Sequence, residues 1–198
     1  MSDISIETIK RLRELTGVGI TDAKNALVEA NGDFDTALEA MRKKGMTKAE
    51  KRGEREARSG VIGSYVHDNR IGVLVEVNCE TDFVARNENF TDLVKDICLH
   101  VAASAPLYVT SEDVPSDERE RVAAEFKEKV IAEGKPADKA DMIVEGMLSK
   151  YFAERCLMDQ PFIKNPDQTV GQYVKEAIAK LGENIVVRRI SRLQLGEV

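Results

Sequence analysis

The sequence is poor in the residues that build compact β-rich folds. Its 198 residues include no Trp and five Pro, and aromatic residues make up 5% of the chain. Charged residues, by contrast, account for 32%. This balance is typical of long solvated helices and argues against an all-β fold. A chain of this length has room for one sizeable core and a small satellite domain.

Cysteine and histidine are too few and too far apart for a metal centre or a disulfide framework. The chain has three cysteines, Cys79, Cys98 and Cys156, and two histidines, His67 and His100. No CxxC pair occurs, and the histidines do not fall at metal-ligand spacing. We therefore expect three buried or half-buried free thiols in a reducing compartment, with no bound metal and no cofactor.

The usual sequence motifs of enzymes are missing as well. There is no GxxxxGK phosphate loop and no GxSxG nucleophile motif. The Gly-Val-Gly of residues 17–19 follows a charged segment rather than an apolar strand, so it predicts a turn between helices. Two carboxylate pairs, Asp92 with Asp96 and Glu118 with Glu120, fall among Lys and Arg on predicted helix surfaces, where charges are ordinarily solvated. The sequence thus predicts a protein that is not an enzyme.

Charge and hydropathy narrow the choice of partners. The formal net charge is −6 and the sequence pI about 5.2, whereas non-specific binding to nucleic acid phosphates favours a basic surface. No run of 18 apolar residues occurs, and the first ten residues lack the apolar stretch of a secretion signal. We expect a cytoplasmic protein that binds neither nucleic acid directly nor a membrane.

The first 45 residues have the pattern of three short helices. In residues 5–16, apolar side chains recur at helical spacing with charged ones between them. Thr21 and Asp22 are expected to start a second helix, and a third is expected over residues 35–45. The stripe of the first helix consists of Ile6, Ile9, Leu12 and Leu15. Three helices of this length form a minimal bundle.

A polar segment, MTKAEKRGEREARSG, follows this bundle at residues 46–60. It contains five Lys or Arg and three Glu, and no apolar face worth burying. We interpret it as a charged linker with some helical character. The predicted domains are therefore a bundle over residues 1–45 and a core over residues 61–198.

The core is expected to begin with a β-hairpin over residues 61–80. Two β-rich runs flank the polar residues 68–70, which predict a short turn. A helix over residues 90–103 should follow. On the second strand, the residues expected on one face are Ile71, Val73, Val75 and Val77.

Residues 115–158 predict a helical hairpin. A charged helix through residue 132 and a second helix from about Lys139 to Cys156 flank a turn at Gly134, Lys135 and Pro136. Its outer faces are too charged for a globular core, so we expect the hairpin to project. The residues of the expected seam are Val122, Phe126, Val130, Met142, Val144, Met147 and Tyr151.

The last segment predicts a helix over residues 173–180 and a long strand over residues 184–195. Because this strand can join the hairpin of residues 61–80, we expect an antiparallel sheet packed on helices. The predicted fold class is α+β: an N-terminal three-helix bundle similar to the ubiquitin-associated fold, then the sheet and the projecting helical hairpin.

The segment EVNCETDFVAR, residues 76–86, carries the clearest functional signal. It joins an apolar strand to a helix and sets a carboxylate, Asp82, beside an aromatic ring, Phe83. Such a knob, supported from both sides, suits insertion into another protein. The alternative is that Thr81 or Asp82 merely caps the turn and that Phe83 folds back as a hydrophobic staple. The residues alone leave both interpretations open.

Two long stretches resemble the elongation factor Ts family, the nucleotide exchange factors of the translational GTPase elongation factor Tu. They are EVNCETDFVAR and, at residues 12–27, LRELTGVGITDAKNAL. The resemblance continues through SYVHDNRIGVLVEV, GKPADKADMIVEGMLSKY, DQPF and GENIVVRRI, and so covers nearly the whole chain. It implies an exchange factor that promotes GDP release from elongation factor Tu.

The resemblance also implies site residues. Thr81, Asp82, Phe83 and Val84 would enter elongation factor Tu beside its nucleotide and disturb the coordination of Mg²⁺. The N-terminal bundle would dock on the GTPase domain, and Lys24 would be a second contact. His67 lies in a segment that is similar to the family segment near the phosphate site of the partner, and we expect it to be a further contact.

The chain departs from the longer members of the family, which have two similar sheet-bearing halves. One half is present here, so we expect a homodimer in which two copies complete the core through the strand of residues 184–195. The alternative to an exchange factor is an adaptor of the ubiquitin-associated type, because the first 45 residues resemble that bundle. Such an adaptor would leave EVNCETDFVAR unexplained.

Overall fold

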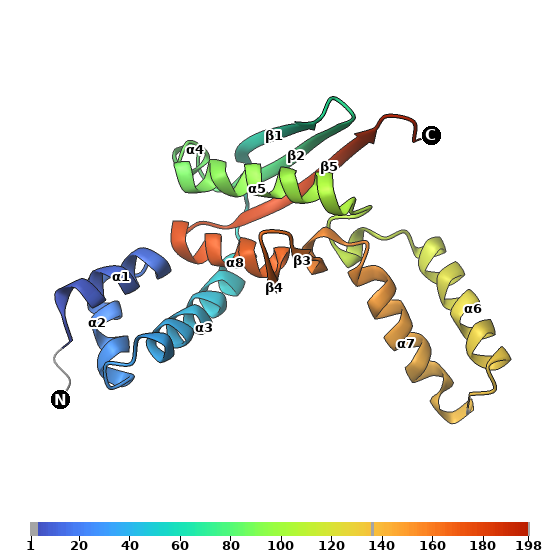
Figure 1. Cartoon of the computed structure of the whole chain (residues 1–198), viewed down its shortest axis with the longest axis horizontal. Helices are drawn as coiled ribbons and strands as arrows, with labels where there is room; N and C mark the ends of the chain where they lie inside the picture. Colours follow the sequence, from blue (N-terminus) through green and yellow to red (C-terminus); the bar gives the residue numbers. More distant parts are fainter. Residues whose placement is uncertain (1–3, 136, 198) are drawn as a thin grey trace. The chain divides into compact units, whose positions relative to one another are not determined.

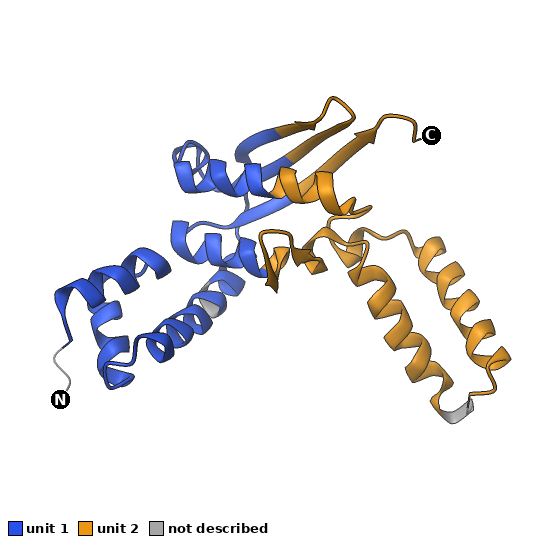
Figure 2. Cartoon of the chain, in the orientation of Figure 1, with its two compact units in different colours: residues 1–63, 76–96, 172–187 blue, residues 64–75, 97–171, 188–198 orange. Residues whose placement is uncertain are grey.

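The structure is a computed structural model that describes residues 4–135 and 137–197; Figure 1 gives its elements in chain order. By their contacts the residues divide into two compact units (Figure 2). Unit 1 comprises residues 1–63, 76–96 and 172–187, and unit 2 comprises residues 64–75, 97–171 and 188–198. The predicted domain boundary at residues 46–60 does not coincide with this division and stays a prediction.

The N-terminal bundle is present as expected. Its helices are α1 (Ile6–Thr16), α2 (Ile20–Glu29) and α3 (Phe34–Arg52). Ser5 caps α1, because its Oγ accepts a hydrogen bond from the Thr8 backbone N–H at 3.1 Å. Gly17 ends α1 in the left-handed region, with φ at 66°. The buried core of the bundle consists of Ile9, Leu12, Ala23, Ala26, Leu27, Ala37 and Met41.

Half of the predicted stripe on α1 is not in that core. Ile9 and Leu12 are buried, but Ile6 is 72% exposed and Leu15 is 55% exposed. A helix of this length presents more than one turn of apolar residues, and α2 and α3 cover the middle of α1 rather than its ends. The prediction that Leu15 is a core residue was therefore wrong.

Two predicted helix bounds also need correction. α2 begins at Ile20, directly after Gly19, rather than at Thr21 and Asp22. α3 does not end at Gly45 but continues to Arg52, so the first part of the predicted linker is helical. At Gly45 an added Cβ would lie 3.1 Å from the Cβ of Ala179, so this glycine permits a close approach between helices rather than a stop.

Side-chain contacts hold the end of α3 against α8 (Val170–Leu181) within unit 1. The Arg52 guanidinium donates to the Ile178 carbonyl oxygen at 3.2 Å, and Lys175 pairs with Glu50 at 3.1 Å. Tertiary contacts, which the local composition does not reveal, thus stabilise the helical form of this polar segment.

The predicted hairpin consists of β1 (Ser59–His67) and β2 (Ile71–Cys79), and β5 (Ile185–Gln194) lies beside β2 in the order β1-β2-β5. The turn is tight: Asp68 and Asn69 have φ of 47° and 55°, and the Arg70 N–H donates to the His67 carbonyl at 2.9 Å. Two consecutive positive φ values are typical of the turn that matches the twist of paired strands.

The alternation predicted for β2 is confirmed. Val73, Val75 and Val77 are at most 3% exposed, while Leu74 between them is 53% exposed. One face of this strand is therefore in the core. The antiparallel sheet and the helices around it confirm the α+β class.

Two helices follow β2: α4 (Asp82–Ala85) and α5 (Glu88–Ser104). α5 includes the predicted helix of residues 90–103 and presents a continuous apolar face. Its buried apolar residues are Phe90, Leu93, Val94, Ile97, Cys98, Val101 and Ala102.

In unit 2, α6 (Ser116–Ala132) and α7 (Ala137–Ala153) pack along each other and confirm the helical hairpin. Val122, Val130 and Val144 are buried in the seam as predicted, but Met142 is 67% exposed. Ala140 takes that place in the seam, because it lies one helical turn before Val144. The predicted turn residue Pro136 lies outside the described residues.

A few short elements of unit 2 were not predicted. They are η1 (Ser111–Asp113), η2 (Leu157–Asp159), and an antiparallel pair of β3 (Pro161–Phe162) with β4 (Asn165–Thr169). An isolated parallel bridge also joins Tyr108 to Cys156. All are too short to leave a periodic pattern in the sequence.

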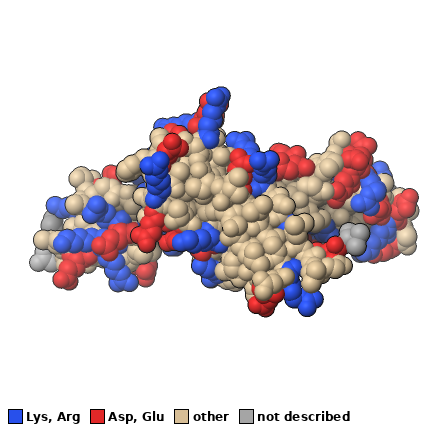
Figure 3. Space-filling view, turned by 90° about the horizontal axis from the view of Figure 1, so that it is seen from above, with Lys and Arg blue, Asp and Glu red and all other residues tan. Residues whose placement is uncertain are grey.

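Within residues 4–135 and 137–197, no helix is both long and apolar enough to cross a membrane. The same residues contain no group of three His, Cys, Asp or Glu that could hold a metal ion. All three cysteines are buried and free, as expected. On the face seen in Figure 3, Lys and Arg intermingle with Asp and Glu rather than forming one basic surface.

Candidate functional site

The predicted knob, defined as Asp82 and Phe83, stands on the single turn of α4. β2 ends at Cys79, and Thr81 then adopts extended dihedral angles as the N-cap of α4. Its Oγ1 accepts a hydrogen bond from the Val84 backbone N–H at 3.4 Å. Thr81 is thus the cap, which satisfies one of the N–H groups left unpaired at the start of a helix.

The side chains of this turn divide into an outward pair and an inward pair. Phe83 is 83% exposed, and Asp82 is exposed beside it. Val84 and Ala85 are each 6% exposed and anchor the turn in unit 1. Phe83 therefore does not fold back as a hydrophobic staple, although the capping half of that alternative is present. An exposed large aromatic ring on a fastened turn is a feature of interaction surfaces.

A second segment of unit 1 fastens the turn. The Thr81 backbone N–H donates to Glu183 Oε2 at 3.0 Å, and the Thr81 hydroxyl donates to Glu183 Oε1 at 2.7 Å. In the opposite direction, the Asn184 N–H donates to Glu80 Oε1 at 2.7 Å. We call these four residues the clasp. Sequence reasoning missed Glu183 and Asn184, whose partners lie about a hundred residues away.

Cys79 lies beneath the knob but has no nucleophilic character. Its Sγ donates to the Thr81 carbonyl at 3.2 Å. Burial, helped by the negative charges of Glu183 and Asp82, raises the pKa of this thiol to about 11. Because the thiolate is the reactive form, Cys79 is a packing residue at neutral pH.

Lys24 lies exposed on α2, in the same unit as the knob. Two apolar residues share its face of the helix, because Ile20 and Val28 lie four residues before and after it. Ile20 is 58% exposed and Val28 is 55% exposed. The four-residue spacing of Ile20, Lys24 and Val28 in the sequence indicates this shared face. The result is an exposed stripe with a cation at its centre.

His67 belongs to unit 2, at the end of β1. Its Nδ1 lies 3.0 Å from the Tyr65 hydroxyl, and its Nε2 lies 3.6 Å from Asp68 Oδ2. The ring is largely exposed and has no nucleophile beside it. It can donate or accept a hydrogen bond at a surface.

His100 has a structural role. It is fully buried, its Nδ1 accepts from the Ile163 N–H at 3.2 Å, and its Nε2 lies 2.9 Å from Gln160 Oε1. Since Nδ1 accepts, Nε2 carries the proton and donates to Gln160. Burial lowers the pKa of this imidazole, and the hydrogen bond to Gln160 opposes that shift in part. His100 is therefore neutral, and its two hydrogen bonds link α5 to Gln160 and Ile163 within unit 2.

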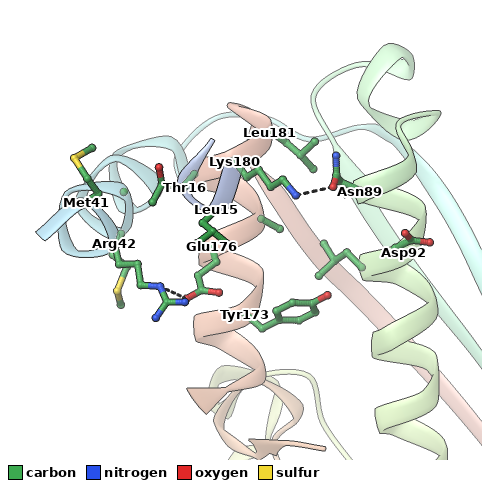
Figure 4. A pocket seen from close by; sticks show the side chains of 15 residues that line it. Leu15, Thr16, Met41, Arg42, Asn89, Asp92, Tyr173, Glu176, Lys180 and Leu181 are labelled. Atoms are coloured by element: carbon green, nitrogen blue, oxygen red, sulfur yellow. Dashed lines mark hydrogen bonds and ion pairs between the residues drawn. The ribbon is translucent and has the colours of Figure 1, made fainter. Parts of the chain in front are cut away.

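Unit 1 also contains a pocket of about 250 Å³ (Figure 4). Leu15, exposed on α1, contributes to its wall. Two polar pairs lie along it: Arg42 with Glu176 at 3.7 Å and Lys180 with Asn89 at 2.7 Å. The lining of this pocket includes no Cys, His or Ser that could act as a nucleophile.

Comparison with known proteins gives one consistent result. The family model described as elongation factor TS matches residues 20–197. Elongation factor Ts of Caldanaerobacter subterraneus subsp. tengcongensis is 49% identical over 195 residues, covering 98% of this chain and 98% of that protein. Elongation factor Ts of Geobacter sulfurreducens is also 49% identical, covering 98% of this chain and 90% of that protein. The relative from Thermoanaerobacter sp. strain X514 is 48% identical, with shares of 98% and 96%. The chain belongs to the elongation factor Ts family.

Proposed function

We propose that this translation elongation factor binds elongation factor Tu and promotes the release of its GDP by disturbing the site that holds Mg²⁺ and the phosphates. The observation that carries the proposal is Phe83, 83% exposed beside Asp82 on a turn that is otherwise buried and clasped. The factor would act by binding, and no covalent bond would form or break. We therefore propose no enzymatic chemistry for it.

Burial of the ring supplies the driving force in this proposal. Transferring a Phe side chain from water into an apolar site stabilises a complex by about 1.5–3 kcal/mol. If Phe83 enters between helices of the GTPase, that free energy favours the displaced packing. Asp82 would accept hydrogen bonds from donors that the displacement sets free. Val84, which is buried, would support the knob from below and make no contact with the partner.

Nucleotide release follows from the role of the metal. Mg²⁺ bridges the nucleotide phosphates to protein ligands and contributes much of the affinity of such GTPases. A partner that moves one of these ligands weakens GDP binding. By linkage, GDP must then weaken the binding of the factor by the same ratio. The two ligands would displace each other in turn.

Docking would rely on the exposed stripe of α2. Ile20 and Val28 offer apolar area around Lys24, which suits a surface with an acidic rim. We keep His67 as a further contact, because its exposed imidazole can bind a polar group of the partner. An adaptor of the ubiquitin-associated type is not proposed, since the family match runs through residue 197 and includes the knob.

The release of a fluorescent GDP analogue from elongation factor Tu tests this function. Wild-type protein should accelerate release by at least a hundredfold, and Phe83→Ala and Asp82→Ala should each lose most of that acceleration. Leu107→Ala, which truncates a side chain 62% exposed in unit 2, is the matched control and should behave as wild type. Equal rates with and without the wild-type protein would exclude an exchange factor.

We also propose that two copies associate through the sheet. Support comes from β5, an edge strand in the order β1-β2-β5, and from apolar residues left exposed in unit 2. These residues, with their exposed fractions, are Val66 (63%), Leu74 (53%), Leu193 (74%) and Leu195 (69%). Exposed apolar area of this kind is characteristic of an interface between subunits.

Light scattering tests the association. Wild-type protein should have twice the mass of the 22.0 kDa chain at micromolar concentration, and Leu74→Lys should shift it toward the monomer. Leu107→Lys, a charge placed on an exposed loop residue, should leave the mass unchanged. A wild-type protein that scatters as a monomer would exclude the homodimer.

A further inference from the structure

Two carboxylates continue the pairing of β2 with β5 beyond the last residue of β2 and before the first residue of β5. β2 ends at Cys79 and β5 begins at Ile185, so Glu80 and Thr81 follow β2, and Glu183 and Asn184 precede β5. There the backbone N–H of Thr81 donates to the side chain of Glu183, and the N–H of Asn184 donates to the side chain of Glu80. Side chains thus take the place of the carbonyl acceptors of a sheet.

Glu183 differs from Glu80 in what it holds. Glu80 accepts from Asn184 and lies 3.5 Å from the Arg55 guanidinium, so it fixes the start of β5. Both oxygens of Glu183, however, accept from one residue, Thr81. Hydrogen bonds to a charged acceptor are short and strong, and two of them fix both the position and the rotation of that residue.

The hydroxyl of Thr81 makes two hydrogen bonds: it donates to Glu183 and accepts from the Val84 N–H. Its hydrogen points to Glu183 Oε1 at 2.7 Å, so its lone pairs remain free for the Val84 N–H. That second contact is the cap that starts α4 at Asp82. Without Glu183, the hydroxyl can rotate and donate its hydrogen to water. Its hydrogen bond with the Val84 N–H, which caps α4, then loses its preferred geometry.

From this geometry we infer that Glu183 is a positioning residue for nucleotide exchange: through Thr81 it orders α4 so that Asp82 and Phe83 are presented outward before the partner arrives. The inference rests on the proposed exchange function. It assigns no contact between Glu183 and elongation factor Tu.

The expected effect is on the rate of exchange more than on docking. If the turn is presented correctly for only a fraction of the time, the maximal rate falls to that fraction of its full value. Loss of two hydrogen bonds to a partly exposed carboxylate should lower it by roughly tenfold. Docking through α2 does not involve the clasp, so the concentration of factor at half-maximal rate should change by less than about twofold.

The test measures release of a fluorescent GDP analogue from elongation factor Tu over a range of concentrations of the full-length factor. The variants are Glu183→Ala, Phe83→Ala and the two together, with Glu183→Gln as the conservative change. Glu125→Ala is the matched control, because it removes an exposed carboxylate paired with Arg121 on α6 in unit 2. We expect a roughly tenfold lower maximal rate for Glu183→Ala, an intermediate rate for Glu183→Gln and a normal rate for Glu125→Ala.

The double variant separates positioning from a general structural effect. If Glu183 acts through the knob, Glu183→Ala should cost less in the Phe83→Ala background than it does alone, because only Asp82 is then left to position. Independent, multiplying effects would overturn the inference, as would a normal maximal rate for Glu183→Ala beside an impaired Phe83→Ala.

Amide hydrogen exchange decides the matter without elongation factor Tu. In Glu183→Ala the amides of Thr81 and Val84 should exchange at least about tenfold faster, while those of β2 stay protected. If wild-type protein failed to release GDP, the proposed function would fall, and unchanged protection at these two amides would overturn the positioning role separately. Glu183→Gln replaces Glu183→Ala in every comparison if the alanine variant does not fold.

Discussion

Two consecutive helices, α4 and α5, differ in the burial of a phenylalanine. Phe83 on α4 is 83% exposed, whereas Phe90 on α5, seven residues later, is fully buried. The two rings have the same hydrophobicity, so transfer from water favours the burial of each by about 1.5–3 kcal/mol. Leaving Phe83 in solvent forgoes that stabilisation in the free protein.

The difference has a geometric origin. α5 is 17 residues long, and its apolar residues recur at helical spacing, so burying one of them buries the rest. α4 has four residues, two of which already face inward. Its direction is set by the Thr81 cap and the clasp with Glu183 instead of by an apolar stripe. A short turn with polar fastening can thus hold an apolar ring outward, whereas the ring of Phe90 lies on the apolar face of α5 and is buried with it.

The largest expected effect lies on the buried side of this comparison. Phe90→Ala should lower the free energy of unfolding by about 3–5 kcal/mol, because it leaves a cavity in a packed core. Urea denaturation followed by circular dichroism measures this loss. A loss under about 1 kcal/mol would mean that the buried ring of Phe90 stabilises the fold little more than the exposed ring of Phe83.

The next effect is a pH dependence from His100, which lies on the same helix as Phe90. The pKa of its imidazole is lowered below 6.5 in the folded state, so below pH 6.5 the unfolded chain binds more protons than the folded one. Stability from this group is therefore complete above that pH and is lost as pH falls, by up to about 1.4 kcal/mol for each pH unit.

Urea denaturation at pH 7.5 and at pH 5.5 tests this pH dependence, with one variant at each histidine. His100→Gln, which cannot titrate, should lose less stability than wild type between these two pH values. His67→Gln removes an exposed ring and should follow wild type. Parallel curves for wild type and His100→Gln would show that His100 does not titrate on unfolding.

A smaller effect distinguishes Cys79, which lies before α4 at the end of β2, from Cys98, which is a buried residue of α5. Burial raises the pKa of both Cys79 and Cys98 to about 11, so at pH 8 about one in a thousand of each is thiolate. Both should be alkylated slowly. Glu183→Ala should speed the alkylation of Cys79 by about fivefold to tenfold and leave Cys98 unchanged, because it loosens the turn above Cys79 and removes a negative charge that raises the pKa of that thiol. Peptide-level mass spectrometry measures each rate.

The smallest effect on stability is expected at the knob itself. Phe83→Ala should change the free energy of unfolding by less than about 0.5 kcal/mol, since the ring makes little contact in the free protein. Urea denaturation of this variant beside Phe90→Ala completes the comparison. A loss of more than about 2 kcal/mol at Phe83 would favour the staple interpretation instead.

Much of the fold could be predicted because it is written in local periodicity. The alternation of Val73, Val75 and Val77 gave β2, and the polar residues at Asp68 and Asn69 gave its turn. Where prediction failed, distant contacts had decided the outcome. Gly45 was taken as a helix end, although it lies inside α3 where that helix passes close to Ala179.

The candidate site divides in the same way. The sequence places Asp82 and Phe83 next to each other between a strand and a helix, and it spaces Ile20, Lys24 and Val28 along one face of α2. It gives no sign of Glu183, because a pairing with Thr81 across 102 residues leaves no short-range pattern. Whether Phe83 faced solvent or its own core was likewise undecided.

By itself, then, the sequence determined the class of fold, the order of the elements, the free thiols and the family resemblance, because each depends on neighbouring residues or on local motifs. Only the tertiary structure decided that the ring of Phe83 faces outward. That outcome depends on Thr81 being held by a carboxylate from the far end of the chain, and such a bond exists only once β5 lies beside β2.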